Sequence, residues 1–331
     1  MLNPFEKLKL PQKTNDTINI MLKRLPKISG ESVKDREIRR LKEYYDRVKK
    51  YYEFVQEFPR IETLHPFYLE AIKIVADINE LKLCLFETKK SSSISMKILK
   101  NYIGKIRKSD EREANKLMRE AFGRVSSILR KTECINKIID IVIELKRIKS
   151  IDPTLPSIIV SGPPNVGKST LVSKISTAKP EIANYPFTTK EIHVGHILTS
   201  DIHIQVIDTP GILDRPENKR NKIEKKALNA IRNLNGVILF MFDPSISSAM
   251  SVEEQIELFK EIISYRKLLV PVINKIDDKY DEYYDRIVKF LIQENLKWFE
   301  ISAEKNIGID KLLQELFNLL RVSGTNEIQS N

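Results

Sequence analysis

The sequence has few of the residues that stabilise small secreted domains or bind structural metals. Of its 331 residues, only two are cysteines and four are histidines, which excludes a disulfide framework and a cysteine–histidine metal cluster. Cys84 and Cys134 lie in segments with helical periodicity, and we expect both to be reduced, small buried side chains. No run approaches the roughly 20 apolar residues of a membrane span, and residues 1–11 lack the apolar core of a signal peptide. We therefore expect a cytoplasmic protein without membrane contacts.

The positive charge is concentrated in the first half of the chain. Residues 1–150 contain 34 basic and 21 acidic side chains, a net charge of +13, whereas residues 151–331 contain 22 basic and 24 acidic side chains, a net charge of −2. A basic module joined to a near-neutral one favours a polyanion as the partner of the basic half. A solvated, lysine-rich surface without a partner explains the same charge. Hydrophobic residues make up 41% of the chain, which excludes wholesale disorder.

The first half has the periodicity of helices. Residues 32–58 contain no glycine or proline, and Tyr44, Val48, Tyr51 and Val55 recur at the spacing of one helical face. Successive helices with short connections predict an antiparallel, all-α helical bundle for residues 1–150. The other expected helices cover residues 66–86, 94–107 and 109–146, with a loop at the serines 91–93 and a break near Gly123.

The second half alternates short apolar runs with amphipathic stretches. We expect a linker at residues 151–155, which contains one of two closely spaced prolines, then a domain at 156–322 and a flexible tail at 323–331. Strand–helix alternation predicts an α/β domain with a mostly parallel sheet and helices on both faces. The expected strands cover residues 157–160, 202–207, 237–242, 268–273 and 298–301, and the last helix covers residues 310–321.

A glycine-rich loop follows the first predicted strand. Residues 162–169 read Gly-Pro-Pro-Asn-Val-Gly-Lys-Ser and match the P-loop pattern G-x-x-x-x-G-K-[ST] between a strand and a helix. The backbone N–H groups of such a loop converge on phosphate oxygens at a helix N-terminus. Lys168 is expected to contact the β- and γ-phosphates, and the Ser169 hydroxyl to bind Mg²⁺. The loop residues expected to contact a nucleotide are Gly162, Asn165, Val166, Gly167, Lys168, Ser169 and Thr170.

Two further segments are expected to hold the metal and the γ-phosphate. Asp208 begins the sequence Asp-Thr-Pro-Gly at a strand end, where its carboxylate can bind Mg²⁺ through water and the N–H of Gly211 can reach the γ-phosphate. Residues 184–190 resemble a switch loop, in which Thr189 is the candidate second protein ligand of Mg²⁺ and Thr188 the alternative. Departure of the γ-phosphate would release this loop. The residue after Gly211 is Ile212, at a position where many GTPases have a glutamine that orients the attacking water. Isoleucine cannot do this, which predicts slow intrinsic hydrolysis.

Two motifs near the end of the domain point to guanine. In Asn274-Lys275-Ile-Asp277 the carboxylate can accept two hydrogen bonds from guanine, and adenine does not offer the same donors. In Ser302-Ala303-Glu a backbone N–H can meet the guanine O6. Since ligands bind at the carboxyl ends of the strands of an open α/β sheet, these motifs together predict a site for GTP and GDP.

These segments resemble the Nog family, the nucleolar GTP-binding proteins and their archaeal relatives in the Obg-like branch of the GTPases. The resemblance extends over nearly the whole chain to about Leu320, and the chain is most similar to the short archaeal-type form, without the C-terminal extension of eukaryotic members. It rests on residues 3–5, 64–68 and 120–129 in the first half, and on residues 163–170, 178–190, 193–196 and 205–216 in the second.

The resemblance implies a GTPase that acts in biogenesis of the large ribosomal subunit, with the helical domain bound to rRNA and ribosomal protein of the pre-ribosomal particle. In related GTPases, an asparagine at the position of Asn165 helps to bind a K⁺ that acts like an arginine finger. K⁺ is therefore the candidate activating ion beside Mg²⁺, and off the ribosome we expect a monomer. The implied catalytic residues are Lys168, Thr189, Gly211 and Asn165.

Two other functions fit the sequence. The chain could be a ribosome-binding scaffold in which the nucleotide only stabilises the fold, because slow hydrolysis and no hydrolysis look alike at Ile212. It could also be a translation- or stress-regulating Obg-like GTPase on mature ribosomes. A small-molecule kinase is disfavoured by the guanine-selective Asn274 and Asp277. The basic residues expected to contact rRNA phosphates are Arg112, Lys116, Arg119, Arg124, Arg130 and Lys131.

Overall fold

The computed structural model describes residues 3–148, 151–184, 191–199, 202–208, 232–264 and 268–328. The chain divides into a helical unit, residues 4–64 and 75–146, and an α/β unit, residues 1–3, 65–74 and 147–331. The segment 65–74 thus groups with the α/β unit, although the sequence division at residue 150 assigns it to the helical domain. Among the helices described, none combines the length and the apolar character that crossing a membrane requires.

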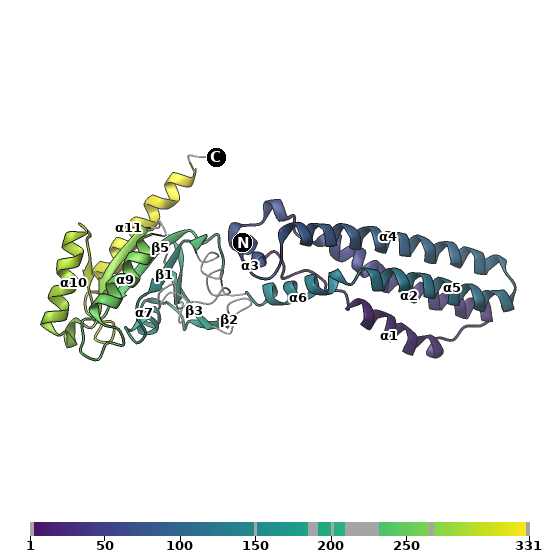
Figure 1. The fold of residues 1–331 in the computed structure, drawn as a ribbon, viewed down its shortest axis with the longest axis horizontal. Helices are drawn as coiled ribbons and strands as arrows, with labels where there is room; N and C mark the ends of the chain where they lie inside the picture. The colour runs from purple at the N-terminus through teal and green to yellow at the C-terminus, as the bar shows by residue number, and fades with distance from the viewer. Residues whose placement is uncertain are drawn as a thin grey trace. The chain divides into compact units, whose positions relative to one another are not determined.

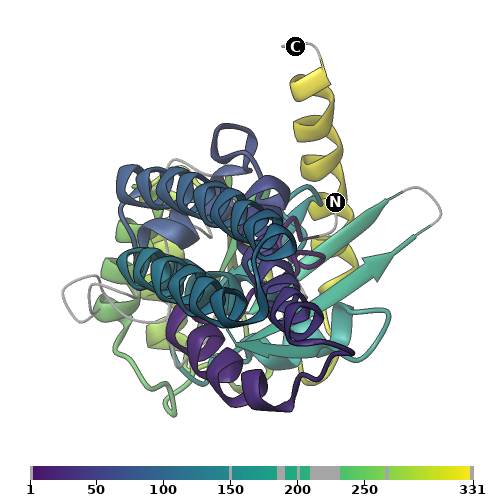
Figure 2. The ribbon, with the colours of Figure 1, turned by 90° about the vertical axis from the view of Figure 1, so that its right-hand side faces the viewer.

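Long helices form the core of the helical unit, and α2, α4 and α5 run side by side (Figures 1 and 2). Tyr44, Val48 and Tyr51 of α2 are buried as predicted, and Phe54 rather than Val55 completes the buried face. The helices are α1 (Thr14–Arg24), α2 (Val33–Glu57), α4 (Ile78–Lys108), α5 (Glu111–Lys131) and α6 (Cys134–Lys146).

The predicted loop at the serines 91–93 is wrong, because these residues lie inside α4. The Ser92 hydroxyl donates to the Thr88 carbonyl oxygen at 2.7 Å, so this serine bonds within the helix instead of ending it. The actual break comes earlier, before residue 78. There the Asp77 carboxylate caps α4 by accepting hydrogen bonds from the N–H groups of Asn79 and Glu80.

The predicted break near Gly123 is also wrong. α5 continues through Gly123, where an added Cβ would meet no atom within 4 Å. The helix ends instead at Lys131, and α6 begins at Cys134. The Thr132 hydroxyl donates to the Ile128 carbonyl oxygen at 2.8 Å, which satisfies one of the last carbonyl groups of α5.

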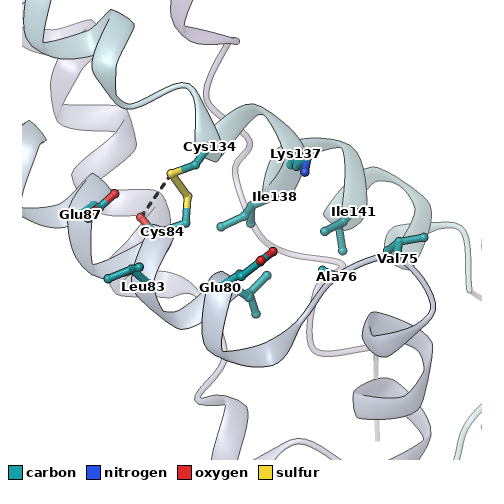
Figure 3. A pocket seen from close by; sticks show the side chains of 11 residues that line it. Val75, Ala76, Glu80, Leu83, Cys84, Glu87, Cys134, Lys137, Ile138 and Ile141 are labelled. Carbon is teal, nitrogen blue, oxygen red and sulfur yellow. Dashed lines mark hydrogen bonds between the residues drawn. A yellow bond between two sulfur atoms is a disulfide. The ribbon is translucent and has the colours of Figure 1, made fainter.

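The two cysteines form a disulfide, which corrects the prediction that both are reduced (Figure 3). Cys84 lies on α4 and Cys134 begins α6, and packing of these two helices brings their Cα atoms to 5.9 Å. Their distance of 50 residues in the sequence gave no indication of this pairing. The bond borders a mostly apolar pocket of about 270 Å³, and Leu83, Ile138 and Ile141 are among the residues that line it.

Replacing both cysteines with serine is expected to lower the free energy of unfolding by about 2–4 kcal/mol, because the bond closes a long loop and restricts the unfolded chain. Urea denaturation of the full chain, followed by helical circular dichroism, measures this loss. A reducing agent should destabilise the wild type by a similar amount and leave the double variant unchanged. Equal stability of the two proteins, with two titratable thiols in the native wild type, would contradict the bond.

The α/β unit is built on a sheet that has seven strands in the described part of the chain, in the order β2-β3-β4-β1-β5-β6-β7. The five predicted strands are present, and β4, β1, β5, β6 and β7 pair in parallel. β2 and β3 extend one edge by antiparallel pairing and were not predicted. The strands are β1 (Ser157–Ser161), β2 (Glu181–Asn184), β3 (Glu191–Leu198), β4 (His203–Asp208), β5 (Gly236–Phe242), β6 (Leu268–Ile273) and β7 (Phe299–Glu300).

Helices cover both faces of this sheet, as predicted. On β5, Leu239 and Met241 pack in one core with α7 and α11, whereas Phe240 and Phe242 contact Phe259 of α9 on the other face, both with ring centroids 5.1 Å apart. α11 continues beyond residue 321, so the expected flexible tail from residue 323 is helical up to Ile328. The α-helices in the described part of this unit are α3 (Pro66–Lys73), α7 (Lys168–Ile175), α9 (Val252–Ile263), α10 (Asp281–Gln293) and α11 (Ile309–Ile328).

Candidate functional site

The glycine-rich loop joins β1 to α7 at the carboxyl end of the parallel strands. Gly162 and Gly167 have φ angles of 139° and 99°, which L side chains rarely adopt. A Cβ at Gly162 would lie 2.4 Å from the Met241 carbonyl oxygen, and one at Gly167 would lie 2.6 Å from Asn274 Nδ2. Both glycines are therefore required for this path, which the P-loop pattern predicted.

Lys168 is the first residue of α7 and folds back across the loop. Its ammonium donates to the carbonyl oxygens of Gly162 at 3.0 Å and Pro163 at 2.8 Å, and the residue is 7% exposed. The ammonium is thereby held over the loop, next to a helix N-terminus. Both the positive charge and the N–H groups of a helix terminus attract phosphate oxygens.

Ser169 and Asp208 lie together beside the loop, as a shared Mg²⁺ site requires. The Ser169 hydroxyl donates to Asp208 Oδ2 at 2.5 Å, and the second carboxylate oxygen is buried with no hydrogen-bond partner among the described residues. Mg²⁺ prefers hydroxyl, carboxylate and water oxygens, so this buried, unpartnered acceptor fits the ion or a water bound to it. His193 Nδ1 lies 3.5 Å from Asp208 Oδ2, and the sequence motifs did not assign this histidine to the site.

Asn274 joins three of the predicted motifs. It is buried, its amide Nδ2 donates to the Val166 carbonyl oxygen at 2.7 Å, and its Oδ1 accepts from the Ala303 N–H at 2.9 Å. The glycine-rich loop and the segment after β7 are thereby fixed against the end of β6. Buried amides that use both a donor and an acceptor in this way fix the geometry of a site.

Asp277 presents a carboxylate to a cavity of about 330 Å³ between these loops. A hydrogen bond from Ser302 and the Lys305 ammonium, 3.1 Å from the carboxylate, hold the pKa of Asp277 below its usual range. The group therefore stays an acceptor down to acidic pH, which recognition of the guanine N–H donors needs. The cavity is lined by Asn165, Gly167, Thr170, Asn274, Lys275, Asp277, Asp278, Ser302, Ala303 and Glu304.

Most of the predicted site is brought together in one place. The glycine-rich loop, Asp208 and the two guanine motifs lie at the carboxyl ends of β1, β4, β6 and β7. Thr189, its alternative Thr188, Gly211 and Ile212 lie outside the described residues. Within the described residues, no group of three or more histidines, cysteines and acidic side chains is placed to hold a metal.

Sequence reasoning missed several residues next to this site. Lys305 pairs with Asp277, and Asp278 and Glu304 line the cavity. Asp278 and Glu304 adjoin or belong to recognised motifs, so their sequence position was the available signal. The Lys305 contact depends on the turn after Ser302, in which the Lys305 N–H donates to Ser302 Oγ at 3.2 Å, and no spacing rule predicts it.

Comparison with known families assigns both parts of the chain. Residues 5–152 match the family described as the NOG1 N-terminal helical domain, and residues 157–275 match the family described as 50S ribosome-binding GTPase. The two matched segments follow each other in the order that the sequence analysis expected.

The relatives found agree with this assignment. The chain is 32% identical over 330 residues to nucleolar GTP-binding protein 1 of Drosophila melanogaster, covering 94% of this chain and 51% of the relative. It is 39% identical over 228 residues to an uncharacterized protein of Methanocaldococcus jannaschii, covering 67% of this chain and 63% of the relative. The chain spans about half the length of most of the curated relatives it matches.

Among solved structures, one similar chain is a candidate nucleolar GTP-binding protein 1 from Plasmodium falciparum. It is 34% identical, covers 54% of this chain and 93% of its own length, and has a TM-score of 0.48.

Proposed function

The chain belongs to the family of nucleolar GTP-binding proteins, and from this premise we propose that it is a GTP-hydrolysing switch in assembly of the large ribosomal subunit. The observation that carries the proposal is that Asn274, at the start of the loop 274–280 (the guanine loop), is bonded to the glycine-rich loop and to the segment after β7. With these two bonds in place, Asp277 and the glycine-rich loop line the same cavity. We propose that the Asp277 carboxylate selects the base there. The proposed reaction converts GTP and water to GDP and phosphate.

We propose that each end of the nucleotide is held by separate residues. At the phosphate end, Lys168 neutralises charge on the β- and γ-phosphates, and Ser169 and Asp208 hold Mg²⁺, the latter through water. When bound, Mg²⁺ supplies charge stabilisation for phosphoryl transfer. At the base end, Asp277 accepts the guanine N–H donors. No glutamine follows Gly211 in the sequence, so we propose that intrinsic hydrolysis is slow and that a bound partner accelerates it.

K⁺ is expected to accelerate this hydrolysis. Asn165 lies on the loop with a φ of 61° and lines the cavity, where its side chain can help to hold a monovalent cation near the developing charge. Because one such electrostatic stabiliser is worth about 10²-fold or more, GTP turnover should rise at least about tenfold in K⁺ over matched Na⁺ buffer. Asn165→Ala should remove the difference. Equal turnover in the two buffers, with and without ribosomal subunits, would exclude K⁺ activation.

We propose that the helical unit binds rRNA and ribosomal protein of the pre-ribosomal large subunit. Its net charge supports this, and the six basic residues of α5 expected to contact phosphates are all exposed. Phosphate contacts release counterions, so affinity for rRNA should fall steeply as salt concentration rises. An rRNA affinity of the full chain that barely changes between low and high salt would contradict this part of the proposal.

One experiment separates the switch from its alternatives. Single-turnover cleavage of bound GTP should accelerate when large ribosomal subunits are added, whereas a scaffold with a structural nucleotide would show no stimulation. Depletion in cells should then leave immature large subunits in sedimentation profiles. Normal subunits with altered translation would favour the regulatory GTPase on mature ribosomes.

We propose that the protein acts as a monomer off the ribosome and in the cytoplasm, where ribosomes function. The disulfide removes the cysteine argument for a reducing compartment, since disulfides are rare in cytosolic proteins. The location therefore rests on the ribosomal partner alone. Fractionation of cells that express the tagged chain tests it, and co-sedimentation with large subunits is the expected result.

A further inference from the structure

The buried carboxylate of Asp243 contacts the guanine loop through Lys275 and belongs to none of the nucleotide motifs. Asp243 follows β5, is fully buried, and its Oδ2 lies 2.5 Å from the Lys275 ammonium. Its Oδ1 accepts from the backbone N–H and the hydroxyl of Ser245 at 2.9 and 2.6 Å. Gln255, buried on α9, bonds both the N–H and the carbonyl oxygen of Asp243. Since a buried carboxylate is destabilising unless it is paired, these contacts fix where it lies.

The backbone beside Asp243 is bonded to both ends of the guanine loop. The Phe242 carbonyl oxygen accepts from the Asn274 N–H at 2.9 Å, and the Pro244 carbonyl oxygen accepts from the Tyr280 N–H at 2.9 Å. The segment 242–245 therefore holds both ends of the loop 274–280 by backbone hydrogen bonds. Between these two bonds, the Asp243 side chain adds an ion pair with Lys275.

Lys275 is the residue on which this contact acts. Its φ of 56° and ψ of 37° are left-handed, a conformation that a residue with a Cβ adopts only when its surroundings hold it. The short 3₁₀ turn Ile276–Asp278 follows directly and contains Asp277. Lys275 also lines the cavity, and its ammonium is bound by Asp243. The ion pair thus connects the buried Asp243 to Lys275, a residue that lines the proposed base-binding cavity.

We propose that Asp243 is a positioning residue for guanine recognition and acts through Lys275. It holds the lysine stem against the cavity and maintains the left-handed turn that presents Asp277 to the base. This inference rests on the proposed guanine-nucleotide function. Because the phosphate end is held by Lys168 and Ser169, Asp243 should affect GDP and GTP equally and leave cleavage of bound GTP unchanged.

Titration of the full chain with fluorescent GDP and GTP tests the proposal. Asp243→Asn and Lys275→Met should each raise the Kd of both nucleotides at least about tenfold, and Asp243→Asn should keep single-turnover cleavage at saturating GTP within about twofold of wild type. The double variant should be no weaker than Lys275→Met alone, because residues that act as one unit are not additive. Effects that multiply in the double variant would overturn the proposal.

The exposed pair Lys279–Asp281, at 3.3 Å, supplies matched controls. Lys279→Met and Asp281→Asn remove the same charges on the same loop and helix start, and should leave both Kd values within about twofold. If Asp243→Asn does not fold, the Kd values of Lys275→Met and Lys279→Met for GDP and GTP are compared instead. Equal Kd values in these two variants would overturn the proposal. A melting temperature that falls while both Kd values stay unchanged in the folded variants shows a structural role only. If wild type binds GDP no better than ADP, the proposed function itself fails.

Discussion

Asp277→Asn is expected to weaken binding of GTP and GDP by about 100- to 1,000-fold, because the site loses two charge-assisted hydrogen bonds to the base. The amide of the variant offers one donor where the carboxylate offered only acceptors. Xanthine has a carbonyl oxygen where guanine has its exocyclic amine, so xanthosine nucleotides should bind the variant better than guanosine nucleotides do. Competition of unlabelled nucleotides against a fluorescent analogue measures the affinities of the variant for the guanosine and xanthosine diphosphates and triphosphates.

Asp281→Asn is the control for this exchange, since Asp281 is an exposed acidic residue at the start of α10 with a lysine partner. It should leave the guanosine affinity unchanged and create no xanthosine binding. An Asp277→Asn protein that binds GTP as tightly as wild type would show that the cavity beside Asn274 does not hold the base. The low pKa of Asp277 further predicts that wild-type affinity is retained as pH falls to about 5 and is lost only below the usual aspartate range.

Lys168→Met is expected to lower the affinity for GTP by about 1,000-fold and to abolish measurable cleavage. The methionine keeps the length of the buried stem but removes the charge that the carbonyl groups of Gly162 and Pro163 hold over the loop. Charge-assisted contacts with phosphate are among the strongest in proteins. Filter binding of labelled GTP and single-turnover cleavage measure the two losses.

Lys174→Met changes an exposed lysine in the last turn of the same helix and should alter neither quantity. Tight GTP binding by Lys168→Met would mean that the phosphates lie elsewhere than over the glycine-rich loop. Loss of binding with retained helical circular dichroism and an unchanged unfolding midpoint would support the assignment, because a folding defect would move all three.

The motifs of the candidate nucleotide site could be recognised in the sequence because most of them act through local backbone geometry. A glycine-rich turn between a strand and a helix places backbone N–H groups where they can bind phosphate, and the observed loop has the predicted glycines at positive φ. Strand ends supplied the remaining motifs at the same edge of the sheet. Asp243 and Lys305 were missed because their roles come from contacts between segments far apart in the sequence, which no local pattern encodes.

In the helical unit the sequence predicted the type of structure better than its boundaries. α2 covers nearly the expected range because it has one long amphipathic face, although Phe54 and not Val55 completes the buried side. The serines 91–93 were misread because serine is favoured in turns. Inside α4 the Ser92 hydroxyl instead donates to the Thr88 carbonyl oxygen of the preceding turn. The pairing of Cys84 with Cys134 depends on how α4 packs on α6, and helix packing cannot be read from periodicity alone.

Calorimetric titration of the purified wild-type chain with GDP and with ADP, in Mg²⁺ buffer, tests the central claim most directly. A site that pairs a carboxylate with the guanine edge should bind GDP at least about 1,000-fold more tightly than ADP. Comparable dissociation constants for the two nucleotides would contradict a guanine-selective switch, whatever the ribosomal partner.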